Sequence, residues 1–289
     1  MKTFFVSAVM LFVVLTSIPT VVAQTALYDD FSSTFFNPDK WVGSETGNQA
    51  REAFRSRFKS QLRLTLVGYC DILTDSGDCE SSNQLHFTTP GVTSLDAVTF
   101  IQATMTPFTV TITDCPANTG VSTSAGLELV GFFFNNGASV PGNHTNDVRA
   151  RIGLERSGNT DPANTLHVNA RVVLCTNADC TEGTEKDSGD LGALITAAGG
   201  SSLSTTVSIT WSDSTNQLIF QRDAGTPGAV TRTFNYGAAG LSNNSPAGFA
   251  DKRFQANVDV QGCSTTPRPS AFIQGLIDDV FINANAVSP

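Results

Sequence analysis

Apolar and polar residues alternate along most of the chain. In SQLRLTLV, Leu62, Leu64 and Leu66 occupy every second position, and the same pattern recurs in TLHVNARVVL, TTVSITWS and RFQANVDVQ. A period of two is that of a β-strand with one buried face, and turn residues separate the successive segments. No segment has the periodicity of a helix of three turns. The pattern therefore predicts an all-β protein built as a two-sheet antiparallel β-sandwich.

The segment 1–23, MKTFFVSAVMLFVVLTSIPTVVA, departs from this alternation. Lys2 precedes a long apolar run, which is followed by Pro19 and by the small-residue ending VVA. These features favour a cleaved signal peptide over an uncleaved membrane anchor. We expect residues 24–289 to form one exported domain, secreted, periplasmic or surface-bound, with no membrane insertion after cleavage.

Charge narrows the expected partners. The chain has 17 Lys and Arg against 26 Asp and Glu, which gives a net charge of −9 at pH 7. Phosphate backbones require a positively charged protein surface. We therefore expect no nucleic-acid partner.

The six cysteines all lie after residue 23, and an even number in an exported chain indicates disulfides. Zinc binding is the weaker alternative, because no CxxC spacing occurs and no histidine lies near the closely spaced cysteines. Six cysteines allow several connectivities. The short spacings favour two loop disulfides and leave one long-range pair: Cys70 with Cys79, Cys175 with Cys180, and Cys115 with Cys263.

Three segments carry a resemblance to a known superfamily. The opening YDDFSSTFFNPDKW (28–41), the hairpin TVSITWSDSTNQLIFQ (206–221) and the ending GLIDDVFIN (275–283) resemble strands of the concanavalin A-like lectin and glucanase superfamily, the laminin-G-like and laminarinase-like jelly rolls. The resemblance implies a single disulfide-stapled jelly roll. It carries less information about function, because one fold hosts many functions.

The resemblance also implies where ligands bind. In that superfamily the two sheets curve, the concave face commonly binds glycans, and the convex side often holds a structural calcium ion near the chain ends. By this resemblance Asp30 and Asp279 are the expected calcium ligands. The alternative is that these two carboxylates cap turns or face water, since a calcium site needs several further oxygen ligands.

The segment NDVRARIGLERSGNTDPANTLHVNARVVLC (146–175) predicts an amphipathic hairpin. Pairing Glu155 with His167 places Arg151 opposite Arg171. One face is then apolar, and the other is the predicted glycan-contacting face: Arg149, Arg151, Glu155, His167, Asn169 and Arg171. Guanidinium groups bind carboxylates and vicinal hydroxyls, so a glycan, uronate-containing polymers included, is the expected partner.

Two like charges opposite each other require an anion between them. We expect either Glu128 or a ligand to lie between Arg151 and Arg171, and Gln255, Asn257 and Asp259 to extend the polar face. The alternative is an ordinary solvated face with ion pairs across strands.

Catalytic motifs are weak. The segment TEKDSGDLG, with Glu185, Asp187 and Asp190, is closest to the Glu-x-Asp-x-x-Glu strand of laminarinase-type hydrolases, but its composition predicts a solvated loop. AREAFRSR and NQLHF are faintly similar to two strand motifs of alginate-lyase-type jelly rolls, whose third motif is missing, and His86 is read as an ordinary strand residue.

Three functions follow in order of preference. The first is a non-catalytic glycan-binding or surface-associated module with no identified catalytic residue. The second is a polysaccharide lyase or glycoside hydrolase acting on an extracellular polysaccharide. The third is a structural or adhesive domain with no small ligand.

Overall fold

The computed structural model describes residues 24–47, 51–118, 122–158, 161–162, 165–195 and 203–288. The predicted signal peptide lies outside the described residues. The described chain forms two antiparallel sheets, as the alternation predicts. Short 3-10 helices connect some strands: η1 (Thr89–Gly91), η2 (Leu95–Ala97), η3 (Asp213–Thr215) and η4 (Ala284–Ala286). Within the described ranges, no helix has the length and apolarity of a membrane span.

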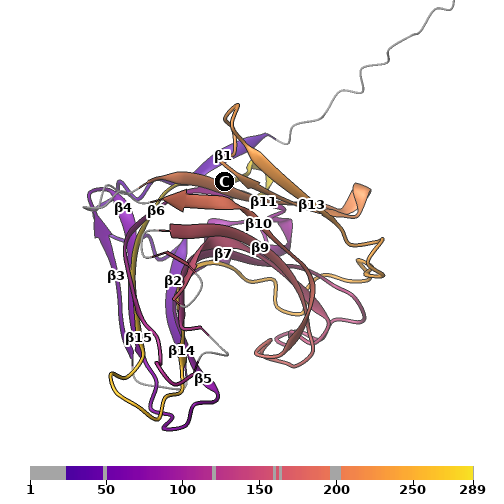
Figure 1. Ribbon diagram of the computed structural model, residues 1–289. Helices are drawn as coiled ribbons and strands as arrows, with labels where there is room; N and C mark the ends of the chain where they lie inside the picture. The colour runs from indigo at the N-terminus through magenta and orange to yellow at the C-terminus, as the bar shows by residue number, and fades with distance from the viewer. Residues whose placement is uncertain are drawn as a thin grey trace, which may run out of the picture.

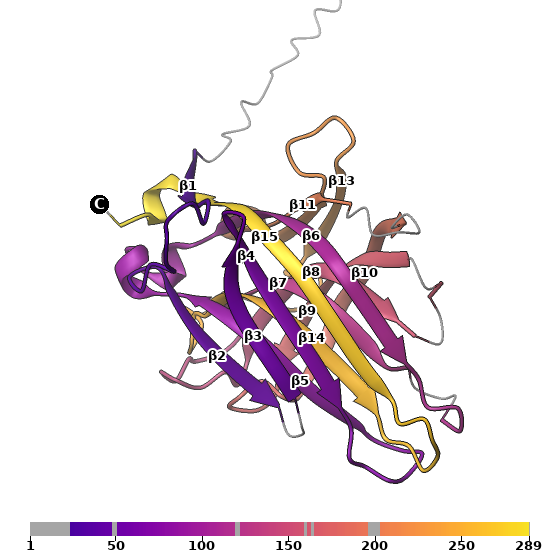
Figure 2. The same ribbon diagram turned by 90° about the vertical axis from the view of Figure 1, so that its left-hand side faces the viewer.

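The outer sheet has eight strands, and Figure 2 shows part of it face on. The chain ends meet here, because β1 (Thr25–Asp29) pairs with β15 (Ser270–Asn283). The remaining order across the sheet is β13 (Val230–Asn235), β12 (Gln217–Arg222), β11 (Thr205–Ser212), β6 (Phe100–Thr113), β15, β4 (Gln61–Tyr69) and β3 (Arg51–Phe58).

The inner sheet has seven strands, and both sheets bend in the same sense, with this sheet on the concave side (Figure 1). Its order is β10 (Gly183–Ile195), β9 (Thr165–Cys175), β8 (Asp147–Ser157), β7 (Ser124–Asn135), β14 (Lys252–Gln261), β5 (Asp78–Phe87) and β2 (Trp41–Gly47). The hairpin predicted from residues 146–175 is therefore part of the concave sheet.

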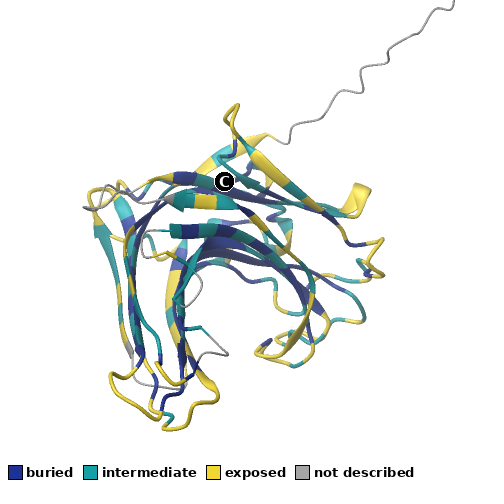
Figure 3. Ribbon diagram, in the orientation of Figure 1, coloured by how far each residue is buried: buried dark blue, intermediate teal, exposed yellow. Residues whose placement is uncertain are grey.

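The core fills the space between the sheets. Leu62, Leu64 and Leu66 of β4 are fully buried, and so are Ile152 of β8 and Val168 of β9 on the facing sheet. Figure 3 shows buried positions running through both layers and exposed positions in the connecting loops. Because side chains alternate along a strand, the residues between the buried ones on β8 and β9 face the concave side.

The opening motif packs where the chain ends meet. Trp41 donates its indole N–H to Oδ2 of Asp29 at 2.6 Å, and its ring lies edge-on to Tyr28 at a centroid distance of 5.2 Å. Burial, followed by the charge of Asp29, raises the pKa of Tyr28 above its usual range. The aromatic residue and the aspartate that resemble the superfamily motif therefore fix the first strand to the core.

All three predicted disulfides are confirmed. Their Cα–Cα distances are 5.3 Å, 5.5 Å and 4.9 Å, within the usual range for a disulfide. The bonds join Cys70 to Cys79, Cys115 to Cys263, and Cys175 to Cys180.

Candidate functional site

The hairpin β8–β9 has the predicted register. Arg151 lies opposite Arg171, and Glu155 lies opposite His167. The apolar residues of both strands are buried, which leaves the charged residues, Arg149 included, on the concave face. The structure therefore places these polar residues on the concave face, as predicted. That they bind a ligand stays a proposal.

Glu128 of β7 is at the centre of this surface, and only 4% of it is exposed. Its Oε1 pairs with Nη1 of Arg151 at 3.2 Å, and its Oε2 accepts a hydrogen bond from Nε2 of Gln255 at 2.7 Å. Gly153, opposite Glu128, makes this arrangement possible, because a Cβ there would lie 2.7 Å from Cγ of Glu128. The charge of Glu128 outweighs burial and raises the pKa of Arg151.

The two opposed arginines have separate carboxylate partners. Arg171 pairs through Nη2 with Oε2 of Glu155 at 3.3 Å, while Arg151 pairs with Glu128. The structure thus pairs Glu128 with Arg151, whereas the carboxylate at Arg171, among the described residues, is Glu155. The facing charges are compensated within the protein.

Arg149 differs from the other two arginines. Its Nε is buried without a hydrogen-bond partner, and its Nη1 donates to the carbonyl of Cys180 at 3.4 Å. Burial, and then the charges of Arg151 and Arg253, lowers its pKa to about 10. Arg253 lies 5.6 Å from the ring centroid of Phe132, which is opposite Arg149 in the ladder. Among the other arginines at this end of the concave face, Arg151 pairs with Glu128 and Arg253 with Asp251. The hydrogen bond of Arg149, in contrast, goes to a backbone carbonyl.

The remaining two predicted contact residues lie toward the edge of the sheet. His167 places Nδ1 2.8 Å from Oδ2 of Asp190 and Nε2 3.6 Å from Oδ1 of Asp161. Asn169 lies opposite Gly153 and Asp190 and is partly exposed. His167 is therefore engaged by two acidic residues, whereas Asn169 lies beside the arginines.

The opposite end of β14 is acidic. Burial, and then the charges of Asp78, Glu80 and Glu155, raises the pKa of Asp259 to about 7. Oδ1 atoms of both Asp259 and its neighbour Asn257 are buried without a partner. Since Arg253 and Asp259 are six residues apart on one strand, the arginine-bearing and acidic ends are roughly 20 Å apart.

The raised pKa of Asp259 predicts a pH-dependent stability. Between pH ~4 and ~7 the folded state keeps a proton that the unfolded chain has lost, so stability falls as pH rises through this window. Asp259→Asn should remove this decline and raise the free energy of unfolding at pH ~8 by on the order of 2 kcal/mol. Urea denaturation at pH ~5 and ~8 measures this, with exposed Asp39→Asn as the control. If the free energy of unfolding changed with pH equally in both variants, Asp259 would not be the group responsible for the decline.

A hydrogen-bonded chain crosses three strands beside the arginine-bearing end. Oγ of Ser44, on β2, is 2.7 Å from Nε2 of His86, on β5. Nδ1 of His86 is 2.7 Å from Oδ1 of Asp251, which directly precedes β14. Arg253 contacts the other carboxylate oxygen, Oδ2. Sequence reasoning missed this group, because its members are remote in the chain and match no motif.

The segment TEKDSGDLG is not a loop, so that prediction is wrong. It belongs to β10, which pairs with β9 despite register shifts after Glu185 and Asp190. The prediction failed because it relied on the polar composition of the segment, which a bulged strand near the sheet edge also tolerates. Asp187 binds Arg232 of β13 at 3.0 Å, and Asp190 binds His167, so the carboxylates have different partners.

The two lyase-like segments lie on different sheets. AREAFRSR overlaps β3 of the outer sheet, whereas NQLHF belongs to β5 of the concave sheet. Arg55 of the first segment nevertheless reaches across to the concave sheet and donates to Oδ1 of Asn83 in the second. The two segments are therefore in contact, with Arg55 also paired to Glu45, and the lyase alternative stays a prediction.

The expected calcium ligands lie near the paired chain ends. Oδ1 of Asp30 accepts the backbone N–H of Ser32 at 2.9 Å, which is turn capping, and Asp279 is exposed. In the described part of the chain, no third carboxylate, imidazole or thiolate joins them at metal-binding distance. Calcium binding at Asp30 and Asp279 stays a prediction.

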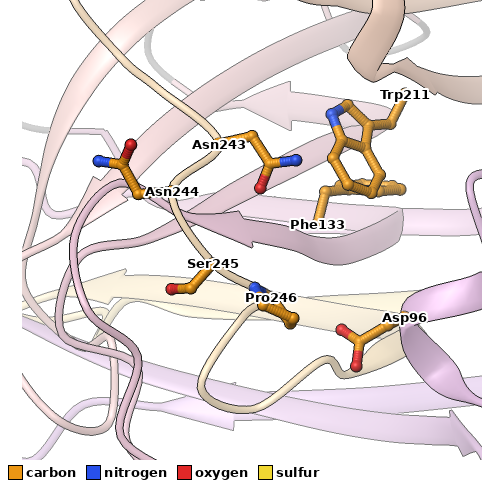
Figure 4. Close-up of a pocket in the computed structure, with 7 residues that line it drawn as sticks. All are labelled: Asp96, Phe133, Trp211, Asn243, Asn244, Ser245 and Pro246. Carbon is orange, nitrogen blue, oxygen red and sulfur yellow. The ribbon is translucent and has the colours of Figure 1, made fainter.

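A pocket of about 240 Å³ lies elsewhere. Figure 4 shows its wall of Phe133 from β7, Trp211 from β11 and Asp96, together with the loop 243–246. Because β7 and β11 belong to different sheets, residues of both layers line this pocket. It is separate from the arginine cluster of the concave face.

Comparisons with known proteins find likeness only among solved structures. No protein-family model matches the chain, and no curated protein matches it. A β-1,3-glucanase from Mycobacterium marinum is 12% identical, with a TM-score of 0.38 over 90% of this chain and 97% of that one. The κ-carrageenase of Pseudoalteromonas carrageenovora, solved with an oligotetrasaccharide of κ-carrageenan, is 8% identical, with a TM-score of 0.37 over 93% and 100%.

An endo-β-galactosidase from Clostridium perfringens that releases GlcNAcα1-4Gal is 11% identical, with a TM-score of 0.37 over 90% of this chain. The chain spans 63% of the length of that enzyme. At these identities and TM-scores the matches do not assign an activity. The two curved sheets agree with the jelly-roll architecture expected from the concanavalin A-like resemblance.

Proposed function

We propose that this protein is an exported glycan-binding β-sandwich whose concave face holds an acidic polysaccharide, for example a uronate polymer. The observation that carries this proposal is the incompletely compensated guanidinium of Arg149. Burying a charge without a partner is costly, and a ligand carboxylate would remove that cost. Export is supported by the three disulfides, which persist in oxidising compartments.

The surroundings of Arg149 suit a sugar acid. Arg151 and Arg253 act on Arg149 from the same face, and the buried ring of Phe132 packs against His144 and Arg253. Amide side chains nearby, Gln255 and Asn169, can exchange hydrogen bonds with hydroxyl groups. A bound uronate would thus have a cation for its carboxylate and amides for its hydroxyls.

Non-catalytic binding ranks above glycoside hydrolysis on this face. Hydrolysis needs two cooperating carboxylates, one acting as an acid. The central carboxylates, Glu128 and Glu155, are each held by an arginine. We therefore assign these two carboxylates the role of holding Arg151 and Arg171 in place.

Arg149→Met should weaken binding and raise stability. Loss of a charge-assisted hydrogen bond should reduce affinity for polygalacturonate or alginate by roughly tenfold or more. The free energy of unfolding should rise by on the order of 1 kcal/mol, because the buried charge is removed. Isothermal titration calorimetry and thermal unfolding measure the two effects.

The matched control is Arg63→Met. Arg63 lies on β4 of the outer sheet, so the same loss of charge occurs on the opposite face. Its affinity for the polyuronate should be unchanged. Equal loss in both variants, or no binding of a polyuronate by the unmodified protein, would overturn the proposal.

A further inference from the structure

We propose that Ser44, His86 and Asp251 form a nucleophile–base–carboxylate triad that hydrolyses carboxylate esters at the rim of the concave face. The substrate class is an O-acylated sugar. That the acyl group is carried by a sugar rests on the proposed glycan binding. That the site hydrolyses esters rests on the three side chains alone.

Strand pairing brings the three groups together. Ser44 lies opposite Gln84, and His86 lies opposite Val42, so Ser44 and His86 are diagonal neighbours on one face of the β2–β5 ladder. The two contacts, from Oγ to Nε2 and from Nδ1 to Oδ1, are both 2.7 Å. This is the geometry that activates a serine: a base within hydrogen-bond reach, oriented by a third group.

The protonation states fit the three roles. Burial opposes ionisation of Asp251, but the hydrogen bond with His86 and the charge of Arg253 outweigh it and lower the pKa to about 2. At neutral pH the carboxylate is therefore an acceptor, so an N–H on Nδ1 of His86 would donate to it. Nε2 is then free to accept the hydroxyl proton of Ser44.

The carboxylate and the nucleophile of the triad differ in their exposure to water. Asp251 is 2% exposed, whereas Ser44 is half-buried on the edge strand β2. Ser44 is thus more exposed than Asp251, and its Oγ lies between Nε2 of His86 and Oε1 of Gln84. Arg253, opposite His86 in the β14–β5 ladder, binds the second carboxylate oxygen of Asp251 and so holds that group in position beside the imidazole.

The reaction is ordinary acyl transfer to water. Oγ of Ser44 attacks the ester carbonyl carbon as its proton passes to Nε2 of His86, giving a tetrahedral oxyanion. The C–O bond to the sugar then breaks, and the departing sugar oxygen takes the proton from Nε2. Water attacks the acyl-serine, gives one proton to Nε2, and the carboxylic acid leaves as Ser44 regains that proton. No electron is gained or lost.

The test is covalent labelling. The full chain without its signal segment is incubated with a fluorophosphonate probe, the labelled peptide is identified by mass spectrometry, and hydrolysis of p-nitrophenyl acetate is measured. We expect label on Ser44. Ser44→Ala should abolish it, and His86→Gln and Asp251→Asn should each lower ester hydrolysis by at least about 100-fold.

Controls separate chemistry from folding. Ser214→Ala changes an exposed serine of η3 and should retain labelling and hydrolysis. Circular dichroism confirms that Ser44→Ala is folded. No label on Ser44, or hydrolysis by folded Ser44→Ala at the original rate, would overturn the triad. Neither probe requires a polysaccharide, so this result is independent of polyuronate binding.

An acetylated polysaccharide tests the substrate class. Acetate release from an acetylated polyuronate, lost in Ser44→Ala, would support hydrolysis of O-acyl sugars. Cleavage of p-nitrophenyl acetate without acetate release from acetylated polyuronate or acetylated neutral glycan would overturn the sugar assignment while the triad stands.

Discussion

Replacing both Cys115 and Cys263 with serine should lower the free energy of unfolding by about 5 kcal/mol. The bond closes a loop with a sequence separation of 148, and the entropy that a cross-link removes from the unfolded chain grows with loop length. Cys115 follows β6 of the outer sheet, and Cys263 follows β14 of the concave sheet. The bond therefore joins the two layers.

Urea denaturation under non-reducing conditions measures this loss. The matched variant replaces Cys175 and Cys180, whose sequence separation is 5, and should lose about 2 kcal/mol. The backbone N–H of Cys115 also donates to Oε1 of Gln261 at 2.8 Å, a contact that can persist without the bond. Equal losses in the two variants would show that loop length does not govern the contribution of these disulfides.

Removing the charge of Glu128 should destabilise the concave face by roughly 3 kcal/mol. In Glu128→Gln, Arg151 keeps its charge and loses its carboxylate, and the hydrogen bond from Gln255 changes its acceptor. Removing one partner of a buried ion pair destabilises the protein by more than the intact pair stabilises it, because the other charge is left buried and uncompensated. Chemical denaturation at neutral pH measures the loss.

Two further variants separate charge from packing. Adding Arg151→Met to Glu128→Gln removes the orphaned charge and should restore more than half of the lost stability. Glu45→Gln breaks the ion pair with Arg55, whose atoms are 3.3 Å apart against 3.2 Å for Glu128 and Arg151, at a more exposed site. This variant should lower the free energy of unfolding by at most ~1 kcal/mol. Equal costs for Glu128→Gln and Glu45→Gln would contradict the role of burial.

The register of the hairpin could be predicted because it follows from the alternation of apolar and polar residues along its two strands. A shift of one residue would turn the apolar set of β8 and β9 away from the core, so the alternation allows only pairings such as Arg151 with Arg171. The disulfides were predictable for a similar reason, since short spacings favour local bonds. In β10 the prediction failed, because it relied on polar composition, which a bulged strand near the sheet edge also tolerates.

The sequence by itself determined most of the strands, the amphipathic face of the hairpin, the disulfide pairs and the sign of the net charge, because each depends on local spacing or on composition. Only the tertiary structure decided which way the sheet bends, that Glu128 binds Arg151, that Nε of Arg149 is buried without a hydrogen-bond partner, and that Ser44 meets His86 and Asp251. These contacts join residues from separate strands. Their distances depend on strand order and sheet curvature, which no local pattern encodes.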